Sequence, residues 1–120
     1  MIARTALVTA ALVAAVTPVA FAGTHHTKAK TRTVGVNDDF YDPAKLTVHV
    51  GDKVKWVWHA NGFSLHDVNV DTGPTEFHSP TQGAGSFSYT FKKAGTYKLY
   101  CTQHEADMTM TVTVKKAPRR

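Results

Sequence analysis

The sequence is poor in cysteine, in acidic residues and in long apolar runs. Its 120 residues contain one cysteine, which excludes an intramolecular disulfide. In an oxidising compartment a free thiol is a liability unless it is buried, reactive or bound to metal, so Cys101 is more consistent with a metal ligand than with a residue of no role. No segment has a sustained helical period, and no apolar run reaches the ~20 residues of a membrane-spanning helix. We therefore expect neither a disulfide-stapled fold nor a transmembrane segment in the mature chain.

Acidic residues are outnumbered by basic ones, nine against fourteen, which gives a net charge of +5. Much of the excess lies at the ends of the chain, at Lys28, Lys30, Arg32, Lys115, Lys116, Arg119 and Arg120. We interpret these ends as solvated tails; the alternative is that they steer the protein toward acidic partners or anionic surfaces. Nucleic acid is not an expected partner, because the chain carries no recognisable binding motif.

The first 22 residues are typical of a signal peptide. Arg4 supplies a positive charge, residues 6–16 form a short apolar run, and Ala20-Phe21-Ala22 matches a small-x-small cleavage site. We therefore expect a protein exported to the periplasm or the extracellular space. The remaining residues suffice for one domain, and a monomer is the default expectation.

After this peptide the pattern indicates a flexible basic leader at 23–32, one domain at 33–115 and a basic tail at 116–120. Within the domain, apolar and polar residues alternate with the period of half-buried strands, and turn residues separate the runs. The alternating apolar positions are Val34, Val36, Leu46, Val48, Val50, Val54, Trp56, Trp58, Phe87, Tyr89, Phe91, Met108, Met110, Val112 and Val114. Residues 71–85 read as a long loop. The sequence predicts an all-β, single-domain Greek-key β-sandwich.

Cys101, His104 and Met108 lie on one short segment at the end of a predicted strand. A thiolate, an imidazole and a thioether are the soft and borderline ligands that suit copper. One more imidazole would complete a trigonal site of two histidines and a cysteine with a weak axial methionine, the arrangement of electron-transfer copper. The alternative for Cys101 is a small buried hydrophobe, and the rival axial ligand is Met110, which we expect to pack in the core.

The candidate for the missing imidazole is His66, at the start of a strand that follows the Asn61-Gly62 turn. A histidine at the mouth of a strand in another sheet region can close a site at one end of a sandwich. His59, at the end of the tryptophan strand, and His78, in the long loop, are the competitors. His49 faces away from its apolar neighbours and is expected to be exposed.

Together these motifs resemble small blue copper proteins of the cupredoxin family, of the plastocyanin/amicyanin type, across residues 33–115. The matching segments are Phe40-Tyr41-Asp42-Pro43, Leu46-x-Val48-x-Val50-Gly51-Asp52-x-Val54-x-Trp56, His66-Asp67-Val68, Gly95-Thr96-Tyr97-x-x-Tyr100-Cys101-Thr102-x-His104 and Met108-x-x-x-Val112-x-Val114. The resemblance implies one copper ion cycling between Cu(II) and Cu(I). Its implied equatorial ligands are His66, Cys101 and His104, and its implied axial ligand is Met108.

Three features depart from the family pattern. The interval from His104 to Met108 is one residue longer than in amicyanin-like loops and one shorter than in plastocyanin-like loops. Asp67 stands where plastocyanins often carry Asn, and an ionised acid there would stabilise oxidised copper and lower the reduction potential. Met110 stands where relatives often carry Gly, which would crowd the loop.

The resemblance further implies a protein that shuttles single electrons between redox partner proteins. The imidazole edge of His104 would be the electron port, within an apolar patch for which Phe63, Leu65 and Ala106 are candidates. We expect no enzyme activity, because four protein ligands leave no open position for a substrate. The chain also lacks the His-x-His pairs and the further domains of multidomain copper oxidases.

The alternative function is an exported copper carrier without an electron-transfer role. Cleavage after Ala22 would leave an N-terminal Gly23-Thr24-His25, whose amine, amide and imidazole nitrogens can chelate a second, weak Cu(II) in a square plane. His26 could assist. A metal-free adhesion-type β-sandwich is a third possibility, but it leaves the Cys/His/Met cluster unexplained.

Overall fold

A computed structural model of the chain describes residue 14, residues 28–59 and residues 64–117. Nearly all of the predicted signal peptide, the whole of the Gly23-Thr24-His25 motif and Phe63 lie outside these residues. Among the described residues there is no helix with the length and apolarity needed to cross a membrane.

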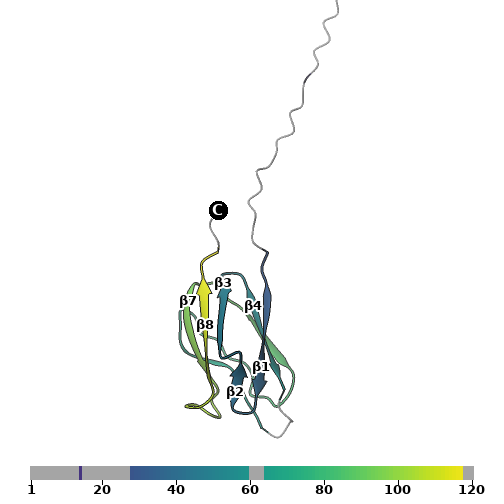
Figure 1. The fold of residues 1–120 in the computed structure, drawn as a ribbon, viewed down its shortest axis with the longest axis vertical. Coiled ribbons are helices and arrows are strands. Elements are labelled where there is room, and N and C mark those ends of the chain that lie inside the picture. The colour runs from purple at the N-terminus through teal and green to yellow at the C-terminus, as the bar shows by residue number, and fades with distance from the viewer. Residues whose placement is uncertain (1–13, 15–27, 60–63, 118–120) are drawn as a thin grey trace, which may run out of the picture.

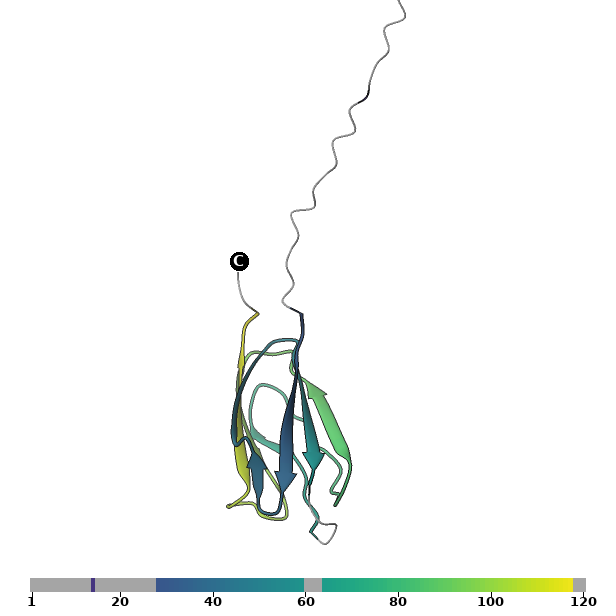
Figure 2. The same ribbon diagram turned by 45° about the vertical axis from the view of Figure 1, so that its right-hand side comes forward.

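Within the described part of the chain, eight strands form two four-stranded sheets packed face to face (Figures 1 and 2). The first sheet has the order β2 (Phe40–Asp42), β1 (Thr31–Asn37), β4 (Lys53–Trp58) and β6 (Ser86–Thr90). The second has the order β3 (Lys45–His49), β8 (Thr109–Lys115), β7 (Gly95–Tyr100) and β5 (Asn69–Thr72). Both sheets combine one parallel pair, β1 with β4 and β3 with β8, with antiparallel neighbours. The predicted all-β, Greek-key sandwich is confirmed.

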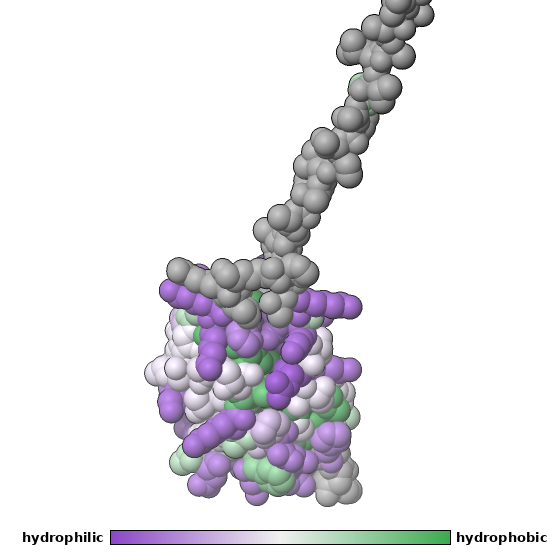
Figure 3. Space-filling model, turned by 45° about the horizontal axis from the view of Figure 1, so that its top comes forward, coloured by the Kyte–Doolittle hydropathy of each residue, from purple (hydrophilic) through white to green (hydrophobic). Residues whose placement is uncertain are grey.

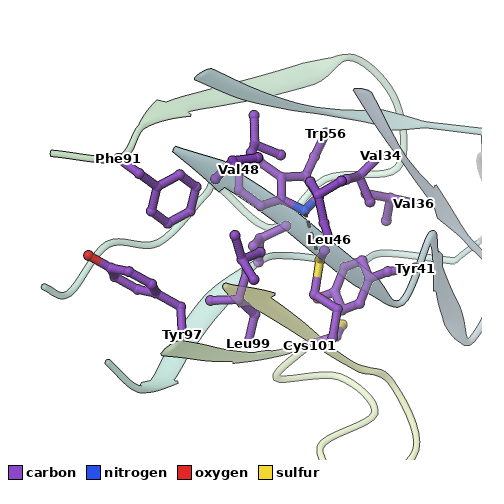
Figure 4. Packing of buried hydrophobic residues seen from close by; sticks show 14 of the residues in the cluster. Val34, Val36, Tyr41, Leu46, Val48, Trp56, Phe91, Tyr97, Leu99 and Cys101 are labelled. Carbon is purple, nitrogen blue, oxygen red and sulfur yellow. Dashed lines mark hydrogen bonds between the residues drawn. The ribbon is translucent and has the colours of Figure 1, made fainter. Parts of the chain in front are cut away.

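The alternation predicted the inward faces of most strands correctly. On β4, Val54, Trp56 and Trp58 are buried, while Lys53 and Lys55 point to solvent. Figure 4 shows the indole of Trp56 in the middle of the core, with its nitrogen turned toward a sulfur. The apolar residues of the edge strand β6 are only half-buried, because no further strand lies beyond them.

The strand directions gather the connections at two opposite ends. One, which we call the loop end, comprises residues 38–44, 64–68, 82–85 and 101–108, and lies at the bottom of Figure 1. The other, the turn end, comprises residues 49–53 and 91–95, and the described chain termini lie on the same side. The loop end therefore holds the histidine, cysteine and methionine candidates together.

At the turn end, Asp52 ties three chain segments. Its carboxylate accepts hydrogen bonds from the backbone N–H of Lys30 at 2.8 Å and of His49 at 2.8 Å. Its backbone carbonyl accepts from the N–H of Phe91 at 3.0 Å. Burial alone would raise the pKa of Asp52, but the hydrogen bonds from Lys30 and His49 outweigh it and hold the pKa below its ordinary value.

Candidate metal centre

The segment that leaves β7 folds into a compact loop held by its own backbone. The N–H of Cys101 donates to the carbonyl of Met108 at 3.0 Å, which closes the loop at its neck. Inside it, the carbonyl of His104 accepts from the N–H groups of Asp107 and Met108, each at 3.0 Å. Cys101 and Met108 are fully buried, whereas the side chain of His104 is 33% exposed. The loop thus presents one partly exposed and two buried candidate ligands.

His66 comes from the connection that passes from the first sheet to the second, and it is fully buried. Its backbone exchanges two hydrogen bonds of 3.0 Å with Gln82, and its carbonyl accepts from the indole N–H of Trp58 at 3.0 Å. The ring Nδ1 of His66 lies 3.9 Å from Cys101 Sγ, and its ring centroid lies 5.2 Å from that of His104. The structure therefore brings His66, Cys101 and His104 together.

The competing residues differ from His66 in their burial and contacts. His59 and His78 are exposed, and the backbone of His78 bridges to that of Asn69. His49 lies at the turn end and is half-buried, not exposed as expected. Met110 is buried in the core, where its sulfur accepts a hydrogen bond from Trp56 Nε1 at 3.3 Å. Met110 therefore already has a structural role in the core.

The donor atoms fit a soft cation such as copper. A separation of 3.9 Å between His66 Nδ1 and Cys101 Sγ is shorter than the ~4.3 Å sum of a metal–imidazole and a metal–thiolate bond of zinc-site length, so one ion can bond to both. Among the described residues, no three His, Cys, Asp or Glu side chains already form a metal-binding group. The geometry thus supplies a close Cys–His pair with the second imidazole beside it.

Burial raises the pKa of the Cys101 thiol, and the nearby charge of Asp67 adds to this effect against opposing backbone hydrogen bonds. Metal binding requires the thiolate, so an ion that binds here must displace the proton of a buried thiol.

Asp67 cross-links the two segments that carry the candidate ligands. It follows His66 directly, yet its Oδ1 accepts from the backbone N–H of Thr102, the residue after Cys101, at 2.8 Å. Its Oδ2 accepts from the hydroxyl of the same threonine at 2.5 Å and from that of Thr81 at 2.8 Å. Its own N–H points at Cys101 Sγ across 3.5 Å. These contacts fix the cysteine relative to the buried histidine.

The same hydrogen bonds determine the charge of Asp67. Burial alone would raise the pKa of this carboxyl, but donation from Thr102 and Thr81 outweighs it and holds the pKa below its ordinary value. The group is therefore ionised at neutral pH, the condition on which the expected lowering of the reduction potential depends. Sequence reasoning singled out Asp67 for its charge and missed its role as a cross-link.

Two further acids contact the histidines and were not expected. Asp38 Oδ1 lies 3.1 Å from His66 Nε2, and Asp39 Oδ1 lies 3.3 Å from His104 Nε2. Both acids form the two-residue turn between β1 and β2, where Asn37 pairs with Phe40. An Asp-Asp pair between alternating runs is a turn signal, but nothing in the sequence shows which side chains the turn would meet.

Comparison with known proteins finds one matching family model and curated relatives. A family model described as a cupredoxin-like domain matches residues 6–114. A plastocyanin from Prochlorothrix hollandica is 36% identical over 84 residues, covering 62% of this chain and 63% of the relative. A halocyanin from Natronomonas pharaonis is 32% identical over 74 residues, covering 60% of this chain and 45% of the relative. The chain thus spans less than two thirds of the length of these curated relatives.

Solved structures share the fold. A reduced variant of amicyanin superposes with a TM-score of 0.62 at 28% identity, covering 71% of this chain and 82% of that one. A copper-containing nitrite reductase from Thermus scotoductus superposes with a TM-score of 0.64 at 27% identity, but this match covers only 22% of the larger protein. The likeness to amicyanin therefore concerns most of that protein, whereas the likeness to the reductase concerns one part of it.

Proposed function

Because this chain belongs to the cupredoxin-like family, we propose that it is a blue copper protein that carries single electrons between redox partners. The proposed ligands of one mononuclear copper ion are His66, Cys101, His104 and Met108. The observation that carries the proposal is the approach of His66 Nδ1 to Cys101 Sγ at 3.9 Å, with the ring of His104 beside them. Copper bound there supplies one-electron chemistry.

The protein's own contribution is a set of donors that is largely buried and held together by hydrogen bonds. Cys101, His66 and Met108 are fully buried, and Asp67 holds the two ligand-bearing segments in fixed relation. A donor set that is held in this way changes little when the charge of the ion changes, which favours electron transfer. Four protein donors leave no position for a substrate, so we propose transfer and not catalysis.

We propose that electrons enter and leave through His104, the one proposed ligand that is partly exposed. Phe40 and Leu65 are the exposed large hydrophobic residues among those described, and both belong to the loop end. Leu65 was a candidate for the apolar patch from the sequence, and Ala106 is also exposed. Phe40 is an addition made by the structure.

The charge around this port differs from that of the whole chain. The segments of the loop end contain no Lys or Arg, and their exposed acids are Asp38, Asp39, Asp42, Glu105 and Asp107. A partner that docks at the port is therefore expected to present a basic face. The excess of basic residues in the chain suggested acidic partners or anionic surfaces as an alternative. We propose that such partners would bind at the turn end and not at the port.

We propose export through the N-terminal segment, with removal of residues 1–22. The intact mass of the protein recovered from the periplasm or the medium tests this. A chain that keeps these residues would contradict it.

The visible absorption spectrum of the mature protein with one equivalent of Cu(II) tests the proposed function, with Cys101→Ala measured beside it. We expect an intense band that depends on the thiolate and bleaches reversibly on reduction. In the same series, Met108→Leu should shift the reduction potential and Met110→Leu should not, because the axial ligand tunes the potential. A weak spectrum that is identical in Cys101→Ala would instead place copper on the N-terminal nitrogens of Gly23-Thr24-His25, as in a carrier.

A further inference from the structure

The β1–β2 turn directs one carboxylate at each of the two proposed histidine ligands. Asp38 meets the buried ring of His66 and Asp39 meets the partly exposed ring of His104, in both cases at Nε2. We propose that this Asp38–Asp39 turn is a positioning element, an inference that rests on the proposed function of the site. It selects the tautomer of both imidazoles and favours Cu(II) over Cu(I).

Tautomer selection follows from the atoms involved. A neutral imidazole has one N–H and one lone pair, and a carboxylate accepts hydrogen bonds but cannot donate them. With Asp38 at Nε2, the proton of His66 is held on Nε2 and the lone pair remains on Nδ1, the atom that lies 3.9 Å from Cys101 Sγ. The same reasoning applies to His104 and Asp39. Both rings are thus set to bind through Nδ1 before any ion arrives.

The turn is suited to this task because its backbone is fixed. Asn37 and Phe40 pair across it, and β1 is held between β2 and β4. Asp39 has a φ of 70°, in the left-handed region that Asp tolerates better than most residues. The side chains of Asp38 and Asp39 therefore point in different directions, the first toward the ring of His66 and the second toward that of His104. The turn also belongs to the first sheet, whereas His104 belongs to a connection of the second.

The two carboxylates differ in how strongly their charge should act. The side chain of Asp38 is 47% exposed and contacts a fully buried ring, whereas Asp39 is 70% exposed and contacts a ring that is 33% exposed. Negative charge close to the ion stabilises its more positive state, and solvent screens this effect. Loss of the Asp38 charge should therefore favour Cu(I) more than loss of the Asp39 charge.

Alanine and asparagine variants separate orientation from charge. Asp38→Ala removes both the acceptor and the charge, whereas Asp38→Asn keeps an acceptor oxygen and removes only the charge; the same pair is made at Asp39. Asp42→Asn is the matched control, because it removes an exposed acid of the same end that forms no ion pair with a histidine among the described residues.

The first readout uses the metal-free protein. Nitrogen-15 NMR of the imidazoles, at about pH 8 or above where free imidazole is neutral, reports the tautomer directly. We expect the Nε2–H form at both rings in the wild type, a mixture at the affected ring in each alanine variant, and recovery in each asparagine variant. Unchanged tautomers in both alanine variants would overturn the proposal.

The second readout is the copper-loaded protein. We expect Asp38→Ala to lower the Cu(II) affinity about 10- to 100-fold, as is typical when an outer partner of a metal-bound histidine is lost. Asp38→Asn should raise the reduction potential, by about 59 mV for each tenfold loss of Cu(II) affinity relative to Cu(I). Asp39→Asn should raise it less, and Asp42→Asn least. Equal potentials in all three variants would overturn the charge effect.

The two proposals fail in different ways. A wild type without a thiolate-dependent band defeats the blue copper function, while the tautomers of the metal-free protein still decide the role of the turn. If Asp38→Ala does not fold, the exposed position of Asp39 lets Asp39→Ala decide it alone.

Discussion

The two ends of the sandwich differ in which side chains pack beside them. The loop end buries the polar side chains of His66 and Asp67, which form hydrogen bonds to distant segments. Toward the turn end, the packing is aromatic: Phe91 meets Phe77, Tyr89 and Tyr97 with the edge-to-face geometry that aromatic rings prefer. The loop end thus gathers the side chains of the proposed copper site, whereas aromatic rings pack together toward the turn end.

Charge divides along the same axis. Lys30, Lys53, Lys92, Lys93, Lys115 and Lys116 lie at or beside the turn end, and Figure 3 shows hydrophilic side chains around this side of the molecule. The acids of the loop end carry the opposite sign. The net charge of +5, which counts the whole chain, therefore does not describe the acidic end that holds the proposed copper site.

The largest effect should come from the turn end. Phe91 is fully buried among three aromatic rings, so Phe91→Ala should lower the free energy of unfolding by about 3–5 kcal/mol. Urea denaturation measures this. The copper spectrum of the folded variant should match the wild type, because no ligand moves. A changed spectrum would show that the two ends are coupled.

A smaller loss is expected for Asp52→Asn, about 1.5–3 kcal/mol at neutral pH, because a carboxylate that accepts two backbone N–H groups is replaced by a neutral amide. The folded-state pKa of Asp52 lies below its ordinary value of 3.8. Its stabilisation is therefore present above pH ~3.8 and is lost as the pH falls through the folded-state pKa.

Urea denaturation of the Asp52→Asn and wild-type proteins across this pH range provides the measurement. The difference between the two should shrink as the pH falls. A difference of the same size at pH 7 and at the acid limit would mean that the charge of Asp52 contributes nothing.

The smallest effect concerns the rate of electron exchange with small reagents. Because the loop end is acidic, a cationic oxidant should react about tenfold faster at low salt than an anionic oxidant of equal driving force. Added salt should slow the cation and speed the anion. Stopped-flow mixing of the reduced protein with each oxidant measures both rates as the appearance of the blue band. The reverse salt dependence would follow the net charge and place the port away from the loop end.

Much of the fold could be predicted from the sequence because burial repeats with period two. The alternation of β3, β4 and β8 reports which face is inside, and the predicted apolar positions are buried except Val50, Phe87 and Tyr89, which are half-buried. Cys101, His104 and Met108 were found because they are neighbours in the chain. His66 required the further argument that the site lacked an imidazole, and the structure places it beside Cys101 and His104.

The features of the site that could not be predicted from the sequence depend on contacts between segments distant in the chain. Asp38 reaches His66 across 28 positions, and Asp67 reaches Thr102 across 35. Neither contact has a local signature, because an exposed turn acid and an acid beside a histidine are ordinary in any sequence. The separation of charge between the two ends likewise appears only when the connections are sorted by the end to which they belong.

The second sheet can be complete only after β8 has paired with its neighbours. This strand is the last of the chain, yet it lies between β3 and β7. Three of the four proposed ligands, Cys101, His104 and Met108, immediately precede it. Pairing between distant segments is slow to form, in the millisecond to second range for sandwiches. On the proposed ligand set, the donors are therefore gathered only when β8 has paired with β3 and β7, so copper would bind there after most of the fold has formed.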